Sequence, residues 1–184
     1  MPPGSIAAAA FGEGSSLPAV VTGRITDAQW RADIAARLAP LCGDSAEAAV
    51  AEWSKSCGAV DLEVLEVVRK LRRQGWRAAL LTNATNRLDA DLARLGLREE
   101  FDAVINSSEL GVAKPDPEVF RLACRLMDAT PEECVFVDDR WENVAAAREA
   151  GLEAHLFIGA DALAQFLGAL HPTKRQLPRR ATAG

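Results

Sequence analysis

The chain has 184 residues, of which 49% are hydrophobic and 26% are charged, and this composition excludes disordered, collagen-like and low-complexity proteins. No apolar run approaches the roughly 18 residues of a membrane span, so we expect no membrane partner. The net charge of -5 and the absence of tyrosine argue against a protein that binds nucleic acid or anionic surfaces. The length favours a single domain.

The cysteines and histidines indicate neither a disulfide framework nor a zinc site. The four cysteines are dispersed and form no C-x-x-C pair, and the chain has only two histidines. Dispersed cysteines, and a start without a basic segment or a long apolar core, predict a cytoplasmic protein. Residues 171–184 contain four basic side chains and no acidic one, which predicts a basic disordered tail.

The first third of the chain is predicted to be helical and carries almost no strand signal. Thr26 and Gln29 have the spacing of a capping box, and apolar residues at helical spacing follow them. A second helix is predicted over 46–53. A third begins at Asp61 as N-cap, and its last turn is basic, which suits the negative end of a helix.

Beyond Gly75, short apolar strands alternate with helices. The predicted strands cover 77–81, 101–105, 134–137 and 154–157. The predicted helices cover 88–95, 117–127, 142–150 and 161–167. Four short buried strands separated by helices predict an α/β protein with a Rossmann-like doubly wound parallel sheet, covered by helices on both faces.

Polar side chains follow three of these strands, at the edge where ligands bind in such sheets. Thr82 and Asn83 follow the first strand, Lys114 lies in the loop after the second, and Asp138 and Asp139 follow the third. Each has an ordinary explanation when taken singly, as a helix-entry turn, a loop lysine or a cap. Together they predict a phosphoryl group bound with Mg²⁺, because carboxylates suit that cation and ammonium and hydroxyl groups suit phosphate oxygens.

Three segments around these residues resemble motifs of the haloacid dehalogenase (HAD) superfamily. LLTNAT at 80–85, SELGVAKPDPEVF at 108–120 and VFVDDRWENV at 135–144 look like its second, third and fourth motifs. The helical first third resembles the end of that family's helical cap. The resemblance implies a partial cap with the N-terminal segment over 1–60, a HAD-like Rossmann core over 61–170 and the basic tail over 171–184.

The resemblance implies roles for the polar residues that precede the acidic pair. Thr82 would form a hydrogen bond to the transferring phosphoryl group, with Asn83 beside it. Lys114 would bridge the phosphoryl group and the nucleophile. The implied activity is hydrolysis of a small phosphorylated metabolite, with Thr82 and Lys114 as catalytic residues.

The resemblance also implies a metal site at the acidic pair. Asp139 would be the direct Mg²⁺ ligand, and Asp138 would be its acidic neighbour. Asn143 lies one helical turn beyond Asp139, where it would either orient Asp139 or serve only as a residue of the first turn of a helix. Family members that dehalogenate haloacids without a metal resemble Ser-Ser-Asn at this place, so the Asp-Asp pair favours the metal-dependent phosphatases.

One departure from the family pattern concerns its first motif, an apolar strand that ends in Asp-x-Asp. The first of those aspartates attacks phosphorus and the second is the general acid/base. The first aspartate here is Asp27, inside a capped helix, and the apolar run 6–11 leads only to Glu13, a poor substitute nucleophile. We therefore expect little or no turnover from this chain.

Three explanations of this departure remain open. The chain is a shortened phosphatase, or a family member that has lost catalysis and keeps a phosphate-binding or protein-binding role, or another segment fills the strand position. Residues 6–11 or a second chain would supply that segment, and unfilled strand edges would favour self-association. A response-regulator receiver domain is disfavoured, because its acidic pair comes first along the chain and this one comes last.

Overall fold

The computed structural model describes residues 1–170, and the predicted tail at 171–184 lies outside them. Contacts divide the chain into two compact units, and each is described by itself. The first comprises Met1–Ala59, Leu81–Arg98 and Ile105–Ala113, and the second comprises Val60–Leu80, Glu99–Val104 and the chain from Lys114 onwards. The division of the sequence at residue 60 into cap and core stays a prediction.

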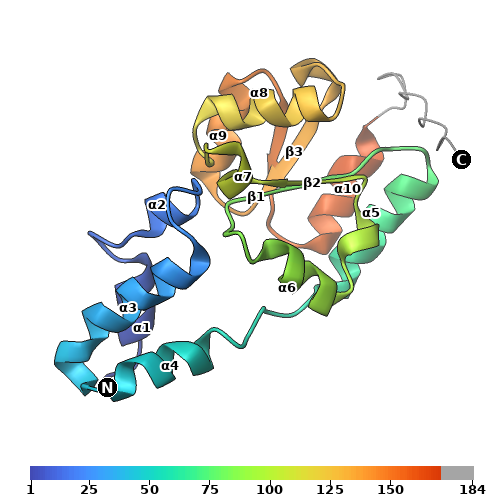
Figure 1. The fold of residues 1–184 in the computed structure, drawn as a ribbon. Coiled ribbons are helices and arrows are strands. Elements are labelled where there is room, and N and C mark those ends of the chain that lie inside the picture. Colours follow the sequence, from blue (N-terminus) through green and yellow to red (C-terminus); the bar gives the residue numbers. More distant parts are fainter. Residues whose placement is uncertain (171–184) are drawn as a thin grey trace, which may run out of the picture. The chain divides into compact units, whose positions relative to one another are not determined.

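The N-terminal part of the first unit is helical, as predicted (Figure 1). It consists of α1 (Ser5–Phe11), α2 (Leu17–Val20), α3 (Asp27–Cys42) and α4 (Ser45–Trp53). The capping box that opens α3 is confirmed, because the Thr26 hydroxyl accepts from the backbone of Gln29 and the Gln29 side chain accepts from the backbone of Thr26. Asp27 is therefore helical and does not follow a strand.

Helix α1 removes residues 6–11 as the segment that could fill the missing strand position. Residues 6–11, considered above as a segment that could fill the strand position, fold as a helix that packs on α3. Two of its alanines, Ala9 and Ala10, are buried. A run of four alanines has high helix propensity and low strand propensity, which explains why the apolar run is helical.

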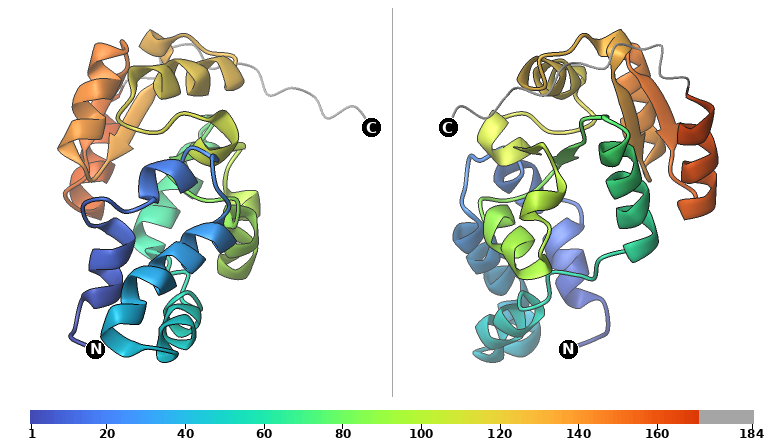
Figure 2. Two further views of the ribbon diagram at one scale, coloured as in Figure 1. Left: turned by 60° about the vertical axis from the view of Figure 1, so that its left-hand side comes forward. Right: turned by 90° about the vertical axis from the view of Figure 1, so that its right-hand side faces the viewer.

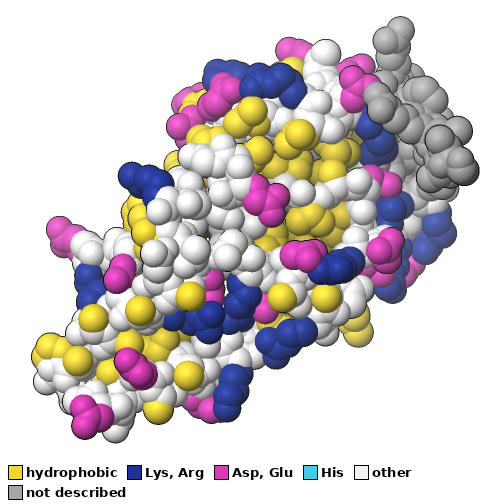
Figure 3. All heavy atoms as spheres, viewed as in Figure 1, with side chains coloured by type: hydrophobic (Ala, Val, Ile, Leu, Met, Phe, Trp, Pro, Cys, Tyr) yellow, Lys and Arg dark blue, Asp and Glu magenta, His cyan; other side chains and the backbone are white. Residues whose placement is uncertain are grey.

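These helices share one small core. Its buried members are Ala9, Ala10, Val20, Trp30, Ile34, Ala35, Leu38, Ala46 and Val50. Beside it, the rings of Phe11, Trp30 and Trp53 lie at centroid distances of 6.0 to 6.1 Å from one another, within the range of favourable aromatic contacts. On the outer face of α3 and α4, hydrophobic side chains appear as small scattered spots between polar ones (Figure 3).

The strand β1 (Ala79–Thr82) is followed by α6 (Leu88–Leu95) and a 3₁₀ turn, η1 (Arg98–Glu100). Next come β2 (Ala103–Asn106) and the short helix α7 (Ser107–Leu110). β1 and β2 form a two-stranded sheet. The predicted end of α6 at Gly96 is confirmed, because this glycine has a φ of 69° and caps the helix in the left-handed conformation.

The remaining elements belong to the second unit. They are α5 (Leu62–Arg73), α8 (Pro117–Leu126), η2 (Pro131–Glu133), β3 (Val135–Asp138), α9 (Trp141–Glu149), β4 (Glu153–Leu156) and α10 (Ala160–Ala169). β3 and β4 run parallel, with Val135 opposite Glu153 and Asp138 opposite Leu156. Helix α9 packs on both strands, and two further views show β3 and β4 side by side (Figure 2).

The alternation of strands and helices confirms the α/β class, but the strands are less buried than predicted. In the part of the chain that the structure describes, β1 pairs with β2 and β3 pairs with β4, and no ladder joins the two sheets. Ala79 in β1 is exposed, and β3 has one buried residue, Phe136. The prediction that all four strands are buried is wrong, because every strand here is an edge strand. Among the helices of residues 1–170, none combines the length and hydrophobicity of a membrane-spanning segment.

Candidate functional site

The candidate site residues of the first unit lie where β1 ends. Thr82 is the last residue of β1 and is half-buried, and Asn83 after it is exposed. The backbone N–H of Ala84 donates to Ser107 Oγ at 3.2 Å. The Thr82 hydroxyl and the Asn83 amide therefore open a loop whose backbone is tied to the residue that follows β2.

The loop from Asn83 to Arg87 is held from a second direction by the end of β2. Asn106 donates from Nδ2 to the carbonyl oxygen of Thr85 at 3.0 Å. Asn106 and Ser107 are fully buried, and both side chains serve backbone groups of the loop. The sequence did not predict a role for these two residues. The polar Asn-Ser pair directly after a predicted strand was the signal that could have indicated one.

The candidate residues of the second unit form a buried polar cluster around Asp138. Lys114 Nζ lies 2.6 Å from Asp138 Oδ2, and the two side chains are only 10% and 7% exposed. The other carboxylate oxygen, Oδ1, accepts from Asn143 Nδ2 at 2.8 Å and from the backbone N–H of Arg140 at 2.9 Å. The Phe136 ring lies 5.5 Å from Lys114 Nζ and covers the pair on one side.

These contacts fix the ionisation of Asp138. Burial alone raises the pKa of this carboxyl group, since it disfavours the charged form. The hydrogen bonds from Lys114 and Asn143 and from the Arg140 backbone outweigh that effect, so the pKa of Asp138 lies below its ordinary value. At neutral pH Asp138 is therefore a carboxylate, and it lies against the Lys114 side chain.

Asp139 differs from its neighbour. Its side chain is exposed, and within residues 1–170 its carboxylate has no hydrogen bond or ion pair. Asn143, predicted to orient Asp139, donates to Asp138 instead and is 4% exposed. That detail of the prediction is wrong, because the first turn of α9 directs the Asn143 amide to the strand residue Asp138 and not to the exposed residue beside it.

The described residues do not assemble a complete metal site. No group of three or more histidine, cysteine, aspartate or glutamate side chains gathers around one point in residues 1–170. Asp138 is engaged by Lys114 and Asn143, which leaves Asp139 as the exposed carboxylate of the pair. One carboxylate is the right kind of ligand for Mg²⁺, but one is too few to hold it without oxygens from elsewhere.

The structure thus brings together Lys114, Asp138 and Asn143. Thr82 and Asn83 belong to the other unit and form a separate group with the loop that follows them. The catalytic and metal-binding roles of all these residues stay predictions.

Comparisons with known proteins agree with one another. A family model described as a haloacid dehalogenase-like hydrolase matches residues 19–151. The human haloacid dehalogenase-like hydrolase domain-containing protein 3 is 32% identical over 167 residues, which is 85% of this chain and 66% of that protein. A phosphoglycolate phosphatase of Cupriavidus necator is 38% identical over 113 residues, 54% of this chain and 49% of that protein.

A solved structure shows the same fold. A HAD family enzyme of Bacteroides thetaiotaomicron, in complex with magnesium and inorganic phosphate, matches with a TM-score of 0.62 at 23% identity over 75% of this chain and 72% of that one. The chain spans 66% and 49% of the lengths of the two relatives above, so it corresponds to less than two thirds of either.

Proposed function

The chain belongs to the haloacid dehalogenase-like hydrolases, and from this premise we propose that it binds the phosphoryl group of a small phosphorylated metabolite at the carboxyl ends of its strands. The observation that carries the proposal is the buried Lys114–Asp138–Asn143 cluster, which holds an ammonium group at the end of β3. The name of the Cupriavidus relative, a phosphoglycolate phosphatase, supports a substrate of this class.

Lys114 supplies the positive charge. An ammonium group has three donors, and one of them is directed at Asp138 Oδ2. Asp138 keeps the ammonium in place and Asn143 keeps Asp138 in place, so the positive charge has a fixed position from which it attracts a phosphate oxygen. Charge-assisted hydrogen bonds of this kind are about twice as strong as neutral ones.

Thr82 and Asn83 supply neutral donors. The threonine hydroxyl and the asparagine amide form hydrogen bonds to further phosphate oxygens, and the loop after β1 is tied down by Ser107 and Asn106. A tied loop loses little conformational entropy when a ligand binds, which raises the affinity.

We infer that Mg²⁺ associates weakly with this chain. When bound, the ion would neutralise phosphate charge, and Asp139 is the residue that would hold it. Its other ligands would have to be phosphate oxygens and water, because Asp138 is engaged by Lys114 and Asn143 and the described residues form no cluster of three or more acidic, histidine or cysteine side chains. Binding of Mg²⁺ should therefore depend on phosphate being present.

We further propose that the chain turns over phosphomonoesters very slowly. No Asp-x-Asp directly follows any of β1 to β4: Asp89 and Asp91 have that spacing but lie within α6, and Asp27, the first aspartate, is a helical residue. Without a nucleophile, the remaining groups bind the phosphoryl group but form no bond to phosphorus. A catalytically inactive phosphate-binding module would use the same residues, and only the rate distinguishes it from an enzyme.

Titration with inorganic phosphate, with and without Mg²⁺, tests the binding proposal. We expect addition of phosphate to change the NMR chemical shifts of Thr82, Asn83 and Lys114. The substitutions Thr82→Val and Lys114→Met should reduce these phosphate-dependent changes. Lys55→Met is the matched control, because Lys55 is exposed and its side chain forms a surface salt bridge with Glu52. Wild-type protein that shows no phosphate-dependent shift contradicts the proposal. A Mg²⁺-dependent rate on an aryl phosphate that Asp139→Asn abolishes contradicts the slow turnover.

A further inference from the structure

Asp27 is buried, and its position in the sequence does not explain this burial. An aspartate in the first turn of a helix usually faces solvent, where it interacts favourably with the helix dipole. Asp27 opens α3 but is only 6% exposed. A buried carboxylate is costly unless its oxygens have partners, so the partners of Asp27 indicate what it does.

Those partners lie in the loop that follows the phosphate-binding candidates Thr82 and Asn83. Thr85 Oγ1 donates to Asp27 Oδ1 at 3.1 Å. In the opposite direction, the backbone N–H of Asp27 donates to Asn86 Oδ1 at 2.8 Å. Two consecutive loop residues are therefore held by one residue of α3.

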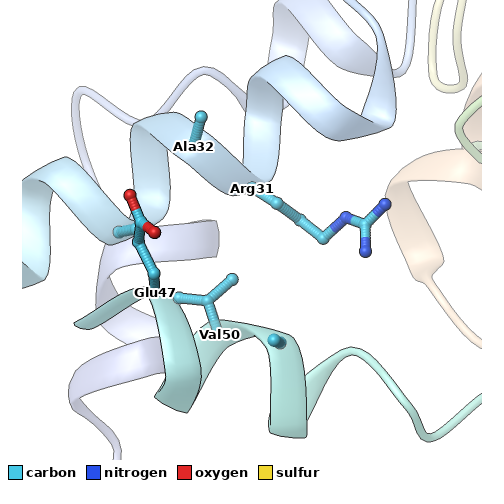
Figure 4. Close-up of a pocket in the computed structure, with 6 residues that line it drawn as sticks. Arg31, Ala32, Glu47 and Val50 are labelled. Carbon is cyan, nitrogen blue, oxygen red and sulfur yellow. The ribbon is translucent and has the colours of Figure 1, made fainter. Parts of the chain in front are cut away.

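The other oxygen of Asp27 anchors it to its own helix. Arg31 Nη2 lies 2.6 Å from Asp27 Oδ2, although without hydrogen-bond geometry, and Arg31 Nη1 donates to Ser54 Oγ at 3.3 Å. Arg31 and Glu47 both line a shallow hollow between α3 and α4, yet the guanidinium extends away from Glu47 (Figure 4). The arginine thus serves Asp27 and the end of α4.

The loop is fastened at its far end to the same place. Arg87 Nη1 donates to the carbonyl oxygen of Ser54 at 2.8 Å, and the Arg87 backbone N–H donates to Thr85 Oγ1 at 3.2 Å. The Thr85 hydroxyl therefore donates to Asp27 while it accepts from Arg87. This chain of hydrogen bonds joins α3, the end of α4 and the loop within one compact unit.

We propose that Asp27 is a positioning residue for phosphate binding: through Thr85 it holds the loop after β1 in the conformation that presents the Thr82 hydroxyl and the Asn83 amide to a phosphoryl group. The inference rests on the proposed function. In this proposal a residue of α3 contributes to ligand affinity indirectly, through the conformation of the loop.

The test compares four variants by phosphate titration and by amide hydrogen exchange. Asp27→Ala removes the acceptor of Thr85, whereas Asp27→Asn keeps an oxygen that can accept. Thr85→Val removes the donor with little change of shape. Arg37→Met is the control on the same helix, because Arg37 donates to the carbonyl oxygens of residues 13 and 14 and not to the loop.

We expect Asp27→Ala and Thr85→Val each to weaken inorganic phosphate binding about tenfold, the change that corresponds to one lost hydrogen bond. The double variant should be no weaker than Thr85→Val alone, because Thr85→Val already removes the contact with Asp27. Asp27→Asn should stay within about threefold of the wild type. Amide exchange at Ala84 and Arg87 should accelerate in Asp27→Ala and stay unchanged in Arg37→Met. In Thr85→Val exchange at Arg87 should accelerate as well, because the Arg87 N–H donates to the Thr85 hydroxyl.

Several outcomes overturn the inference. These are unchanged phosphate affinity in both Asp27→Ala and Thr85→Val, additive losses in the double variant, or an equal loss in Arg37→Met. If Asp27→Ala does not fold, Thr85→Val with Asp27→Asn decides the question. If wild-type protein does not bind phosphate, the proposed function fails by itself. Exchange at Ala84 and Arg87 then still decides whether Asp27 holds the loop, and unchanged rates reject it.

Discussion

The two groups of candidate site residues are held in place by different forces. Around Asp138, the contacts are a buried ion pair and two hydrogen bonds to one carboxylate. Around the loop after β1, they are mostly neutral hydrogen bonds, in which buried side chains such as Asn106 and Ser107 serve backbone groups. The first arrangement fixes a charge, and the second fixes the path of the backbone.

This difference determines how each group responds to change. A buried ion pair contributes little net stability while both partners are present, but removal of one partner leaves an uncompensated charge. A neutral hydrogen bond contributes about 1 kcal/mol and can be lost without a stranded charge. Substitutions in the Asp138 cluster should therefore be the more damaging ones.

The largest effect should come from Lys114→Met. The variant keeps the length of the side chain but leaves Asp138 buried without its cation, so we expect a loss of about 3 kcal/mol in the free energy of unfolding. Denaturant unfolding at neutral pH measures it. Lys55→Met should lie within about 0.5 kcal/mol of the wild type, because its salt bridge is exposed. Equal losses in the two variants would show that the ion pair is not buried in solution.

Ser107→Ala should cost less, about 1 to 2 kcal/mol, because it leaves the Ala84 N–H without its acceptor. Ser108→Ala is a close control on the neighbouring residue, since the Ser108 hydroxyl is buried and has no hydrogen-bond partner within residues 1–170. We expect Ser108→Ala to be neutral or slightly stabilising. A larger loss of stability for Ser108→Ala than for Ser107→Ala would show that the hydrogen bond from Ala84 to Ser107 does not stabilise the fold.

How far the sequence predicted these features depended on the range of the contacts. The capping box at Thr26 and the helix end at Gly96 were predictable, because each depends on residues within one turn. Lys114 and Asp138 were predicted as site residues because both follow strands and lie in long motifs, and the structure places their side chains in contact. The sequence did not predict the partner of Asn143, since the choice between two adjacent carboxylates depends on the direction in which α9 leaves β3.

The burial of Asp27 and the separation of the four strands into two sheets could not be predicted in the same way. Asp27 lies 58 positions before Thr85, and nothing local distinguishes it from an ordinary exposed first-turn aspartate. The apolar residues of β1 and β3 are typical of strands in the middle of a sheet. In the structure each of these strands pairs with one other strand only, and this pairing cannot be read from the pattern of apolar residues. Contacts of this kind become visible only in the assembled structure.

The stability of the Asp138 cluster should depend on pH in the acid range, whereas the neutral hydrogen bonds of the loop after β1 should not. The folded-state pKa of Asp138 is lowered, so its contribution is present above its unfolded value of about 3.9 and is lost as the pH falls through the lower folded-state value. Asp138→Asn should therefore show a shallower loss of stability below about pH 4 than the wild type. Ser107→Ala should keep the wild-type slope. Parallel curves for Asp138→Asn and the wild type would mean that the ion pair does not lower this pKa.

The smallest effect on stability should come from Asp139→Asn. A small effect would show that Asp139 does not belong to the buried cluster around Asp138. Asp139 is exposed and its carboxylate has no partner in the described part of the chain, so the free energy of unfolding should change by less than about 0.5 kcal/mol. Binding of Mg²⁺ in the presence of phosphate should nevertheless fall sharply, because the variant removes the carboxylate that faces solvent. Asp138 and Asp139 would then be adjacent residues with opposite uses, one committed to Lys114 and the other left for a ligand. A loss of stability near that of Lys114→Met would instead make Asp139 part of the buried cluster.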